Sequence, residues 1–233
     1  MDQKKEVIRK FDKIVNDLSL LPVSFRYDGK NYKGFGNQFD EISRNTVQDG
    51  AKITTSICLE YRKELQVDVI LAIYPDYSAY EWTVYFKNIS TDDSALLENI
   101  KCADLSFTGE NPILKGIYGD GGIDDSGPYA PYSMQMKSEK HIHMTPATGR
   151  ATYHYFPYFN LEYGEGGTFI AIGWPILWGA SFEYREDGGE TVDFTAGQES
   201  FSSYLKPGEQ IRTPLAAFLE YEGRDEARAM NLW

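Results

Sequence analysis

The chain has 233 residues, of which 42% are hydrophobic, 25% are charged and 15% are aromatic. Its formal net charge is −12, and such a surplus of carboxylates repels both a nucleic-acid backbone and an anionic membrane surface. We therefore expect a globular protein that binds neither nucleic acid nor membrane, with one large β domain or two small domains. The N-terminal residues "MDQKKEVIRKF" lack the apolar stretch of a secretory signal, so a cytoplasmic location is expected.

The first predicted element is a helix. Apolar residues recur every three or four positions over residues 5–21, and Pro22 would end the helix. This pattern predicts an N-terminal helical segment over residues 1–22.

Strands are predicted from there on, because apolar and polar residues begin to alternate. The clearest alternation lies in "KITTSICLEY", "LQVDVILAIYP" and "YEWTVYFKN", and later strands are predicted in "TFIAIGW", "GASFEYRE", "ETVDFTA", "ESFSSYL" and "TPLAAFLEY". Turn signals separate them at "YPDY", "YGEGG", "REDGGE" and "KPGE". Many short strands joined by hairpin turns are typical of an all-β antiparallel sandwich, here over residues 23–222. The final residues, 223–233, favour the start of a helix.

Residues 110–160 are dense in Gly, Pro, Asp and Tyr, which predicts long loops of functional or interface character. The adjacent carboxylates Asp124 and Asp125 are either a solvated turn or a source of contacts to ligand hydroxyl groups. A calcium site is a weaker alternative, since "DGGIDDSG" lacks the alternating ligand spacing of a calcium loop. His141 and His143 would share a strand face, but no third ligand follows at a fixed spacing, so neither a metal nor a cofactor is predicted.

Two tryptophans in "IAIGWPILWGASFE" leave two interpretations open. If the segment is extended, Trp174 and Trp178 lie on one face, where they either pack in a core or form a stacking platform for a sugar ring.

Four segments together resemble the N-terminal domain of glycoside hydrolase family 36, the α-galactosidases and their relatives. They are "AYEWTVYFKNISTDDSALLENI", "KGIYGDGGIDDSGPYAPY", "TPATGRATYHYFPYFNLEYGEGGTFIAIGWPILWGASFE" and "AGQESFSSYLKPGEQIRTPLAAFLEYEGRDEARAMNLW". The combination of "FPYFNLE", "IAIGW", "AGQE" and "PGEQIRTP" is specific, although each motif alone is weak. The resemblance covers nearly the whole chain and is weakest over residues 1–50.

The resemblance implies a galactose-mutarotase-like β-supersandwich that is followed by a catalytic (β/α)₈ barrel. Members of the family hydrolyse terminal α-galactosides or α-N-acetylgalactosaminides with retention, using a nucleophile in a Lys-aromatic-Asp motif on the barrel. The one match to this motif here, Lys10-Phe11-Asp12, lies on the predicted N-terminal helix and is a chance match. We therefore expect no catalytic residue in this chain, no glycosidase activity from it alone, and residues 223–233 to begin the helical linker to the barrel.

The resemblance also implies where a sugar would be met. The loops "GDGGIDDSGPY" and "ATGRATY" correspond to loops that wall the sugar pocket and the subunit interface in the family. The candidate substrate-binding residues are Asp120, Asp124, Asp125, Arg150 and Trp178, since carboxylates and a guanidinium hydrogen-bond hydroxyl groups well. The implied partners are the barrel domain, an α-galactoside or α-N-acetylgalactosaminide, and further copies of the chain in a homo-oligomer.

One departure from the family is visible, because "IGWPILW" stands where relatives often have "IGWxGQW". Two other functions remain open from sequence. The chain is alternatively a stand-alone carbohydrate-binding protein or a protein-assembly module derived from such a domain.

Overall fold

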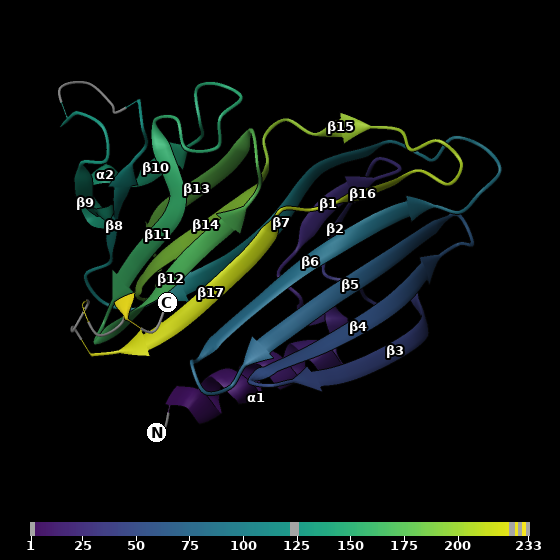
Figure 1. Cartoon of the computed structure of the whole chain (residues 1–233), viewed down its shortest axis with the longest axis horizontal. Coiled ribbons are helices and arrows are strands. Elements are labelled where there is room, and N and C mark those ends of the chain that lie inside the picture. Colours follow the sequence, from purple (N-terminus) through teal and green to yellow (C-terminus); the bar gives the residue numbers. More distant parts are fainter. Residues whose placement is uncertain (1–2, 122–125, 224–226, 228–229, 232–233) are drawn as a thin grey trace. The chain divides into compact units, whose positions relative to one another are not determined.

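A computed structural model describes residues 3–121, 126–223, 227 and 230–231 of the chain. The chain folds into antiparallel strands with few helices (Figure 1), which confirms the predicted all-β sandwich class and the N-terminal helix. Contacts group the residues into two compact units, Met1–Cys102 with Ser200–Leu215, and Ala103–Glu199 with Ala216–Trp233. The predicted boundaries after residues 22 and 222 stay predictions, and most of the expected linker helix lies outside the described residues. Among the described residues, no helix has the length and hydropathy needed to cross a membrane.

The first unit begins with helix α1 (Gln3–Asn16), which buries Val7, Phe11 and Ile14 on one face. The prediction of one helix up to residue 21 was wrong at its C-terminal end. Asp17 takes an extended backbone and its side chain accepts a hydrogen bond from Ser19 N, which caps a short 3₁₀ helix, η1 (Leu18–Leu20). A short acidic side chain at such a cap competes with continuation of the α-helix.

Strands β3, β4, β5 and β6 follow one another side by side in the first unit, with β16 next to β6 (Figure 1). Strand β1 pairs with both β2 and β7, and β15 pairs with β7. The bounds are β1 (Ser24–Tyr27), β2 (Lys30–Lys33), β3 (Asp40–Asp49), β4 (Lys52–Tyr61), β5 (Leu65–Tyr74), β6 (Ala79–Asn88), β7 (Leu97–Thr108), β15 (Ser202–Ser203) and β16 (Gln210–Arg212).

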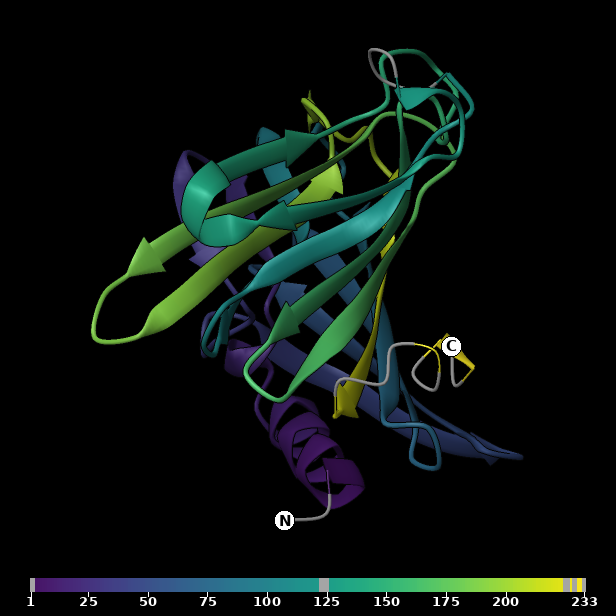
Figure 2. The same cartoon turned by 90° about the vertical axis from the view of Figure 1, so that its left-hand side faces the viewer.

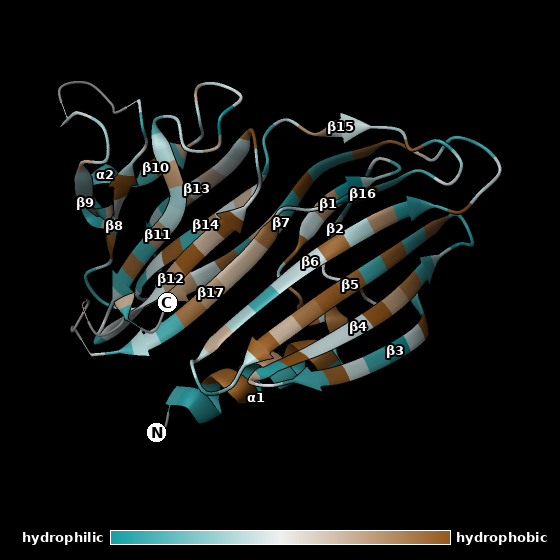
Figure 3. Ribbon diagram, in the orientation of Figure 1, coloured by the Kyte–Doolittle hydropathy of each residue, from teal (hydrophilic) through white to brown (hydrophobic). Residues whose placement is uncertain are grey.

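The core of this unit follows the predicted alternation (Figure 3). On β5, the side chains of Leu65, Val67, Val69 and Leu71 are all fully buried, while the residues between them lie on the other face. Strands β4 and β6 repeat the pattern. Burial of each such aliphatic side chain contributes about 1.5–3 kcal/mol relative to exposure, so the predicted inward faces of these strands are confirmed and form the base of the core.

The second unit contains the order β17-β12-β11-β8-β9 in one sheet and β10-β13-β14 in the other. Figure 2 turns these strands toward the viewer. Buried rings of Phe159, Trp178, Phe182 and Phe194 contact one another between them. The bounds are β8 (Ile113–Tyr118), β9 (Pro131–Gln135), α2 (Met136–Glu139), β10 (His141–Met144), β11 (Tyr155–Tyr163), β12 (Gly166–Gly173), β13 (Trp178–Glu186), β14 (Glu190–Gln198) and β17 (Leu215–Glu222).

Residues 110–160 were predicted as long loops, and the structure corrects this. Strands β8, β9, β10 and the start of β11 lie within that range. They are short and carry Gly and Pro, which obscure a two-residue period. Pro131 starts β9, which among the described residues pairs only with β8. The strand predicted in "ESFSSYL" is only two residues long, Ser202–Ser203.

Asn88 joins three segments of the first unit and is fully buried. Its Nδ2 donates hydrogen bonds to Asp92 O and Leu205 O, both at 2.7 Å. Its Oδ1 accepts from Ser90 N at 2.9 Å and from Ser90 Oγ at 2.8 Å. The amide therefore ties Asp92 and Leu205 to strand β6, and its hydrogen bonds add to those that Ser90 Oγ and Ser94 N donate to the same two carbonyls.

We predict that Asn88→Ala lowers the free energy of unfolding by about 2–4 kcal/mol, because the Ser90 amide loses its partner and the Asp92 and Leu205 carbonyls each lose one of two hydrogen bonds. Urea denaturation of the variant and the parent chain measures the difference. Asn45→Ala is the matched control, since Asn45 is exposed on β3, and it should change stability by less than about 0.5 kcal/mol. Equal losses in the two variants would show that Asn88 is not a structural tie.

Candidate functional site

The structure brings together two of the residues predicted to meet a sugar. Arg150 Nη1 donates a hydrogen bond to Asp120 Oδ2 at 2.7 Å, and the Arg150 side chain is 62% exposed. The guanidinium carbon lies 4.8 Å from the centre of the Tyr153 ring. An ion pair this exposed adds at most about 1 kcal/mol to stability, so its arrangement is of more interest for binding than for folding.

Paired backbone segments hold the two side chains in place. Asp120 N donates to Thr152 O at 2.9 Å, and Gly119 N donates to His154 O at 2.8 Å. Within the second segment, Tyr153 N donates to Arg150 O at 3.2 Å. The loops that carry Asp120 and Arg150 are thus joined through their main chains.

The carboxylate of Asp120 uses its two oxygens differently. Oδ2 pairs with Arg150, whereas Oδ1 is buried and has no hydrogen-bond partner among the described residues. The Arg150 fork also keeps N–H groups beyond the one bonded to Asp120, since the guanidinium has five. The pair therefore retains both acceptor and donor capacity.

Trp178 contacts the residue next to Arg150, but it is not a stacking platform for a sugar. Its ring is fully buried and meets Phe159 edge to face at 5.9 Å, and Nε1 donates to Ala151 O at 2.7 Å. This burial supports core packing over sugar stacking, with the indole N–H anchoring the Arg150 loop. The predicted residues Asp124 and Asp125 lie outside the described residues.

His143 of β10, which the sequence places on one strand face with His141, contacts two polar side chains. His143 Nδ1 is 2.8 Å from Ser181 Oγ, and His143 Nε2 is 3.5 Å from Glu199 Oε1. No group of three or more His, Cys, Asp or Glu side chains suited to a metal occurs among the described residues.

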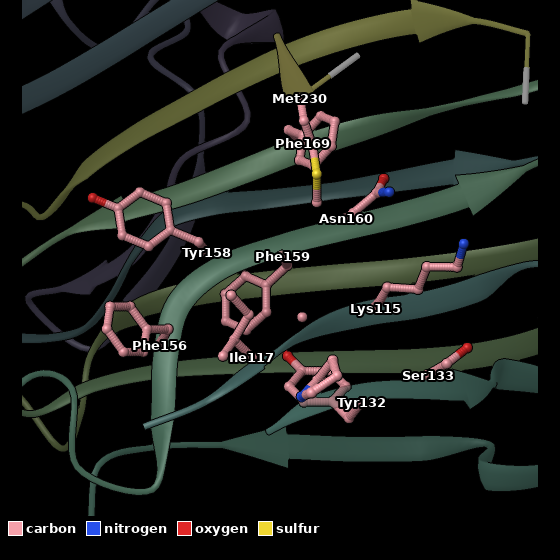
Figure 4. A pocket seen from close by; sticks show the side chains of 12 residues that line it. Lys115, Ile117, Tyr132, Ser133, Phe156, Tyr158, Phe159, Asn160, Phe169 and Met230 are labelled. Atoms are coloured by element: carbon pink, nitrogen blue, oxygen red, sulfur yellow. The ribbon is translucent and has the colours of Figure 1, made fainter. Parts of the chain in front are cut away.

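A groove of about 730 Å³ in the second unit was not predicted as such (Figure 4). Strand β8 contributes Ile117, β11 contributes Phe156 and Tyr158, β12 contributes Phe169, and Met230 of the C-terminal segment lies against it. Ile117, Tyr158 and Met230 are 45%, 50% and 55% exposed. The aromatic-rich segment 153–159 marks an apolar patch in the sequence, but its other walls come from distant strands that no local pattern joins to it.

Tyr132 forms part of the groove wall and illustrates its apolar character. Burial raises the pKa of the Tyr132 hydroxyl, so the phenol stays neutral. Its Oη packs against Gly116, where an added Cβ would lie only 2.3 Å from that oxygen. The volume of the groove lies within the range of about 300–1,000 Å³ that is usual for ligand-binding sites, and its lining is mostly apolar, as in such sites.

Known proteins match this chain in structure but not in sequence. No protein-family model matches the chain, and no curated protein matches its sequence. Solved structures do match: the α-galactosidase from Lactobacillus brevis gives a TM-score of 0.65 at 13% identity, over 87% of this chain and 29% of that one. In fold, this chain is similar to part of an α-galactosidase.

Two further enzymes agree with this α-galactosidase-like fold. The family 36 α-galactosidase AgaA from Geobacillus stearothermophilus gives a TM-score of 0.60 at 13% identity, over 87% of this chain and 30% of that chain. The α-N-acetylgalactosaminidase NagBb from Bifidobacterium bifidum gives 0.52 at 8% identity, over 91% and 32%. The chain thus spans about a third or less of the length of these enzymes. The resemblance found from sequence motifs is confirmed at the level of the fold.

Two glycines, Gly119 and Gly149, give a test of the Asp120–Arg150 geometry. A Cβ at Gly119 would lie 1.8 Å from Thr152 O, whereas a Cβ at Gly149 would meet nothing within 4 Å. We predict that Gly119→Ala lowers the free energy of unfolding by about 1–3 kcal/mol, because the paired backbones must separate. Gly149→Ala should stay within about 0.5 kcal/mol of the parent.

Thermal unfolding followed by circular dichroism compares the two variants. If Gly119→Ala unfolds at the same temperature as Gly149→Ala, the close backbone approach that positions Asp120 is refuted.

Proposed function

We propose that this chain is the non-catalytic β-supersandwich domain of a retaining glycoside hydrolase of the α-galactosidase or α-N-acetylgalactosaminidase type. In this role it packs on the catalytic barrel, helps to wall the sugar pocket and mediates oligomerisation. The observation that carries the proposal is the fold, which matches part of the Lactobacillus brevis enzyme over 87% of this chain. The Asp120–Arg150 pair, on loops expected beside the sugar pocket, adds a chemical reason.

The pair suits a neutral sugar for three reasons. The guanidinium offers N–H donors in a fixed plane, and the carboxylate accepts hydrogen bonds from hydroxyl groups. The two charges balance each other, so the site attracts no counter-ion in place of a polar neutral ligand. Tyr153, stacked under the Arg150 guanidinium, restricts that side chain and lowers the entropy lost on binding.

We predict that galactose binds the isolated chain with a dissociation constant in the millimolar range, about −4 kcal/mol, because one wall of a pocket forms few hydrogen bonds at once. Titration of isotope-labelled protein should shift the amides of residues 119–121 and 150–153. Arg150→Ala and Asp120→Asn should abolish these shifts.

Arg185→Ala is the matched control for this titration, since Arg185 also forms an exposed ion pair, with Asp193 at 2.6 Å, on strands β13 and β14. It should leave the shifts unchanged. Micromolar binding at another surface that survives Arg150→Ala would instead support a stand-alone carbohydrate-binding protein.

The apolar groove of the second unit is proposed as part of the surface that packs on the barrel. Three of its side chains, Ile117, Tyr158 and Met230, are about half exposed on this face. Met230, which follows strand β17 in the chain, also lines the groove. An enzyme domain joined at that end would meet the groove first.

We predict that the isolated chain self-associates through this groove, since Ile117, Tyr158 and Met230 expose apolar surface there. Sedimentation velocity at micromolar concentrations should show dimers or larger species. Tyr158→Asp should shift the distribution to monomer, because a carboxylate in an apolar interface is strongly desolvated.

Tyr77→Asp serves as the matched control, since Tyr77 is a similarly exposed tyrosine (46%) in the first unit. It should leave the association intact. A parent chain that is monomeric throughout, or equal effects of the two variants, would contradict the proposed packing surface.

A further inference from the structure

A second groove, of about 460 Å³, lies on the first unit and differs in character from the apolar one. It occupies the face of strands β3 to β6 opposite the buried core, and β16 contributes one wall. The face is polar because alternation places the residues between the core positions on it.

The centre of the groove is a row of directly opposed residues. Ser43 of β3 pairs with Cys58 of β4, Cys58 with Asp68 of β5, and Asp68 with Tyr85 of β6. From Ser43 to Tyr85 the row crosses three strand spacings, about 14 Å. Asn45 and Ser56, themselves opposed, flank the row on one side.

The hydrogen-bonding groups of this groove are largely uncommitted. In the described part of the chain, the side chains of Ser43, Asn45, Ser56, Tyr85 and Gln210 make no hydrogen bond. Asp68 is different: Gln66 Nε2 donates to its two oxygens at 3.0 and 2.9 Å, which fixes the carboxylate as an acceptor. The groove thus combines a fixed acceptor with free amide and hydroxyl groups.

Apolar surface is also present among these polar groups. The ring of Tyr85 and the side chain of Ile70 line the groove and are half-buried. An aromatic face beside hydrogen-bonding groups matches the C–H face and the hydroxyl groups of a pyranose ring. The carboxylate at the centre, in a chain of net charge −12, disfavours an anionic ligand.

The groove has no feature of a reactive site. Burial and the neighbouring Asp68 carboxylate raise the pKa of the Cys58 thiol to about 11, so the thiol is protonated at neutral pH and is a poor nucleophile. The groove is therefore suited to binding a ligand and not to reacting with one.

We propose that the face formed by strands β3 to β6 binds a neutral oligosaccharide of about three sugar units, with Tyr85 as the stacking surface and Asn45 and Asp68 as the hydrogen-bonding groups. This site is separate from the Asp120–Arg150 pair and does not depend on the function proposed for it.

The test is a titration of the isotope-labelled full chain with raffinose, maltotriose and cellotriose. At least one trisaccharide should shift the amides of Ser56, Asp68 and Tyr85. Asn45→Ala and Tyr85→Ala should each weaken that binding about tenfold or more. Asn45 is exposed on β3, so its variant remains folded and informative even if Tyr85→Ala does not fold.

Two controls separate this site from other effects. Thr54→Ala, on the same face of β4 but outside the groove, should keep full binding. Arg150→Ala should also keep it, which distinguishes failure of this proposal from failure of the pocket-wall proposal. The inference is overturned if none of the three sugars shifts the groove amides, if the shifts survive both groove variants, or if Thr54→Ala weakens binding equally.

Discussion

Alternation along strands β4, β5 and β6 is the constraint on which the first unit depends. Every second residue of β5 from Leu65 to Leu71 is fully buried, and a slip of one residue in strand register would expose all of them. The same constraint fixes the opposite face. Because Asp68 and Ile70 alternate with Val67 and Val69, the outward row is determined once the core is in register. Core and outer groove are therefore consequences of one pattern.

In the second unit, hydrogen bonds between loops fix the positions of side chains that are far apart in sequence. Asp120 and Arg150 are thirty positions apart in sequence, yet main-chain hydrogen bonds at Gly119 and Asp120 align their segments. The fully buried Trp178 adds an anchor from β13 through Ala151 O. Side chains at such a site gain their geometry from backbone contacts and from the absence of a Cβ at Gly119, more than from their own ion pair.

Sequence reasoning succeeded where one physical signal dominated. The inward faces of β4, β5 and β6 were predictable because burial on one side imposes a two-residue period. The ends of helices and the short strands were not predictable, because hydrogen bonds of single side chains compete there with the hydrophobic pattern. Asp17, for example, caps a 3₁₀ helix where the apolar spacing favours a continued α-helix. Motifs singled out Asp120 and Arg150, but their pairing depends on tertiary structure. The apolar groove gathers Ile117, Phe169 and Met230 from separate elements, which no local pattern reveals.

Strand β3 carries a further consequence for how copies of this chain meet. All ten of its residues are exposed, and in the part of the chain that the structure describes it pairs with β4 alone. Such an edge is a template for open-ended growth of a sheet, but here the Glu41–Arg44 ion pair and a register shift between Glu41 and Ser43 interrupt it. A strand added from another molecule would have to displace those charges and follow an irregular ladder. Strand β3 therefore leaves an edge of the sheet open, but its own charges and irregular register oppose fibre formation through that edge.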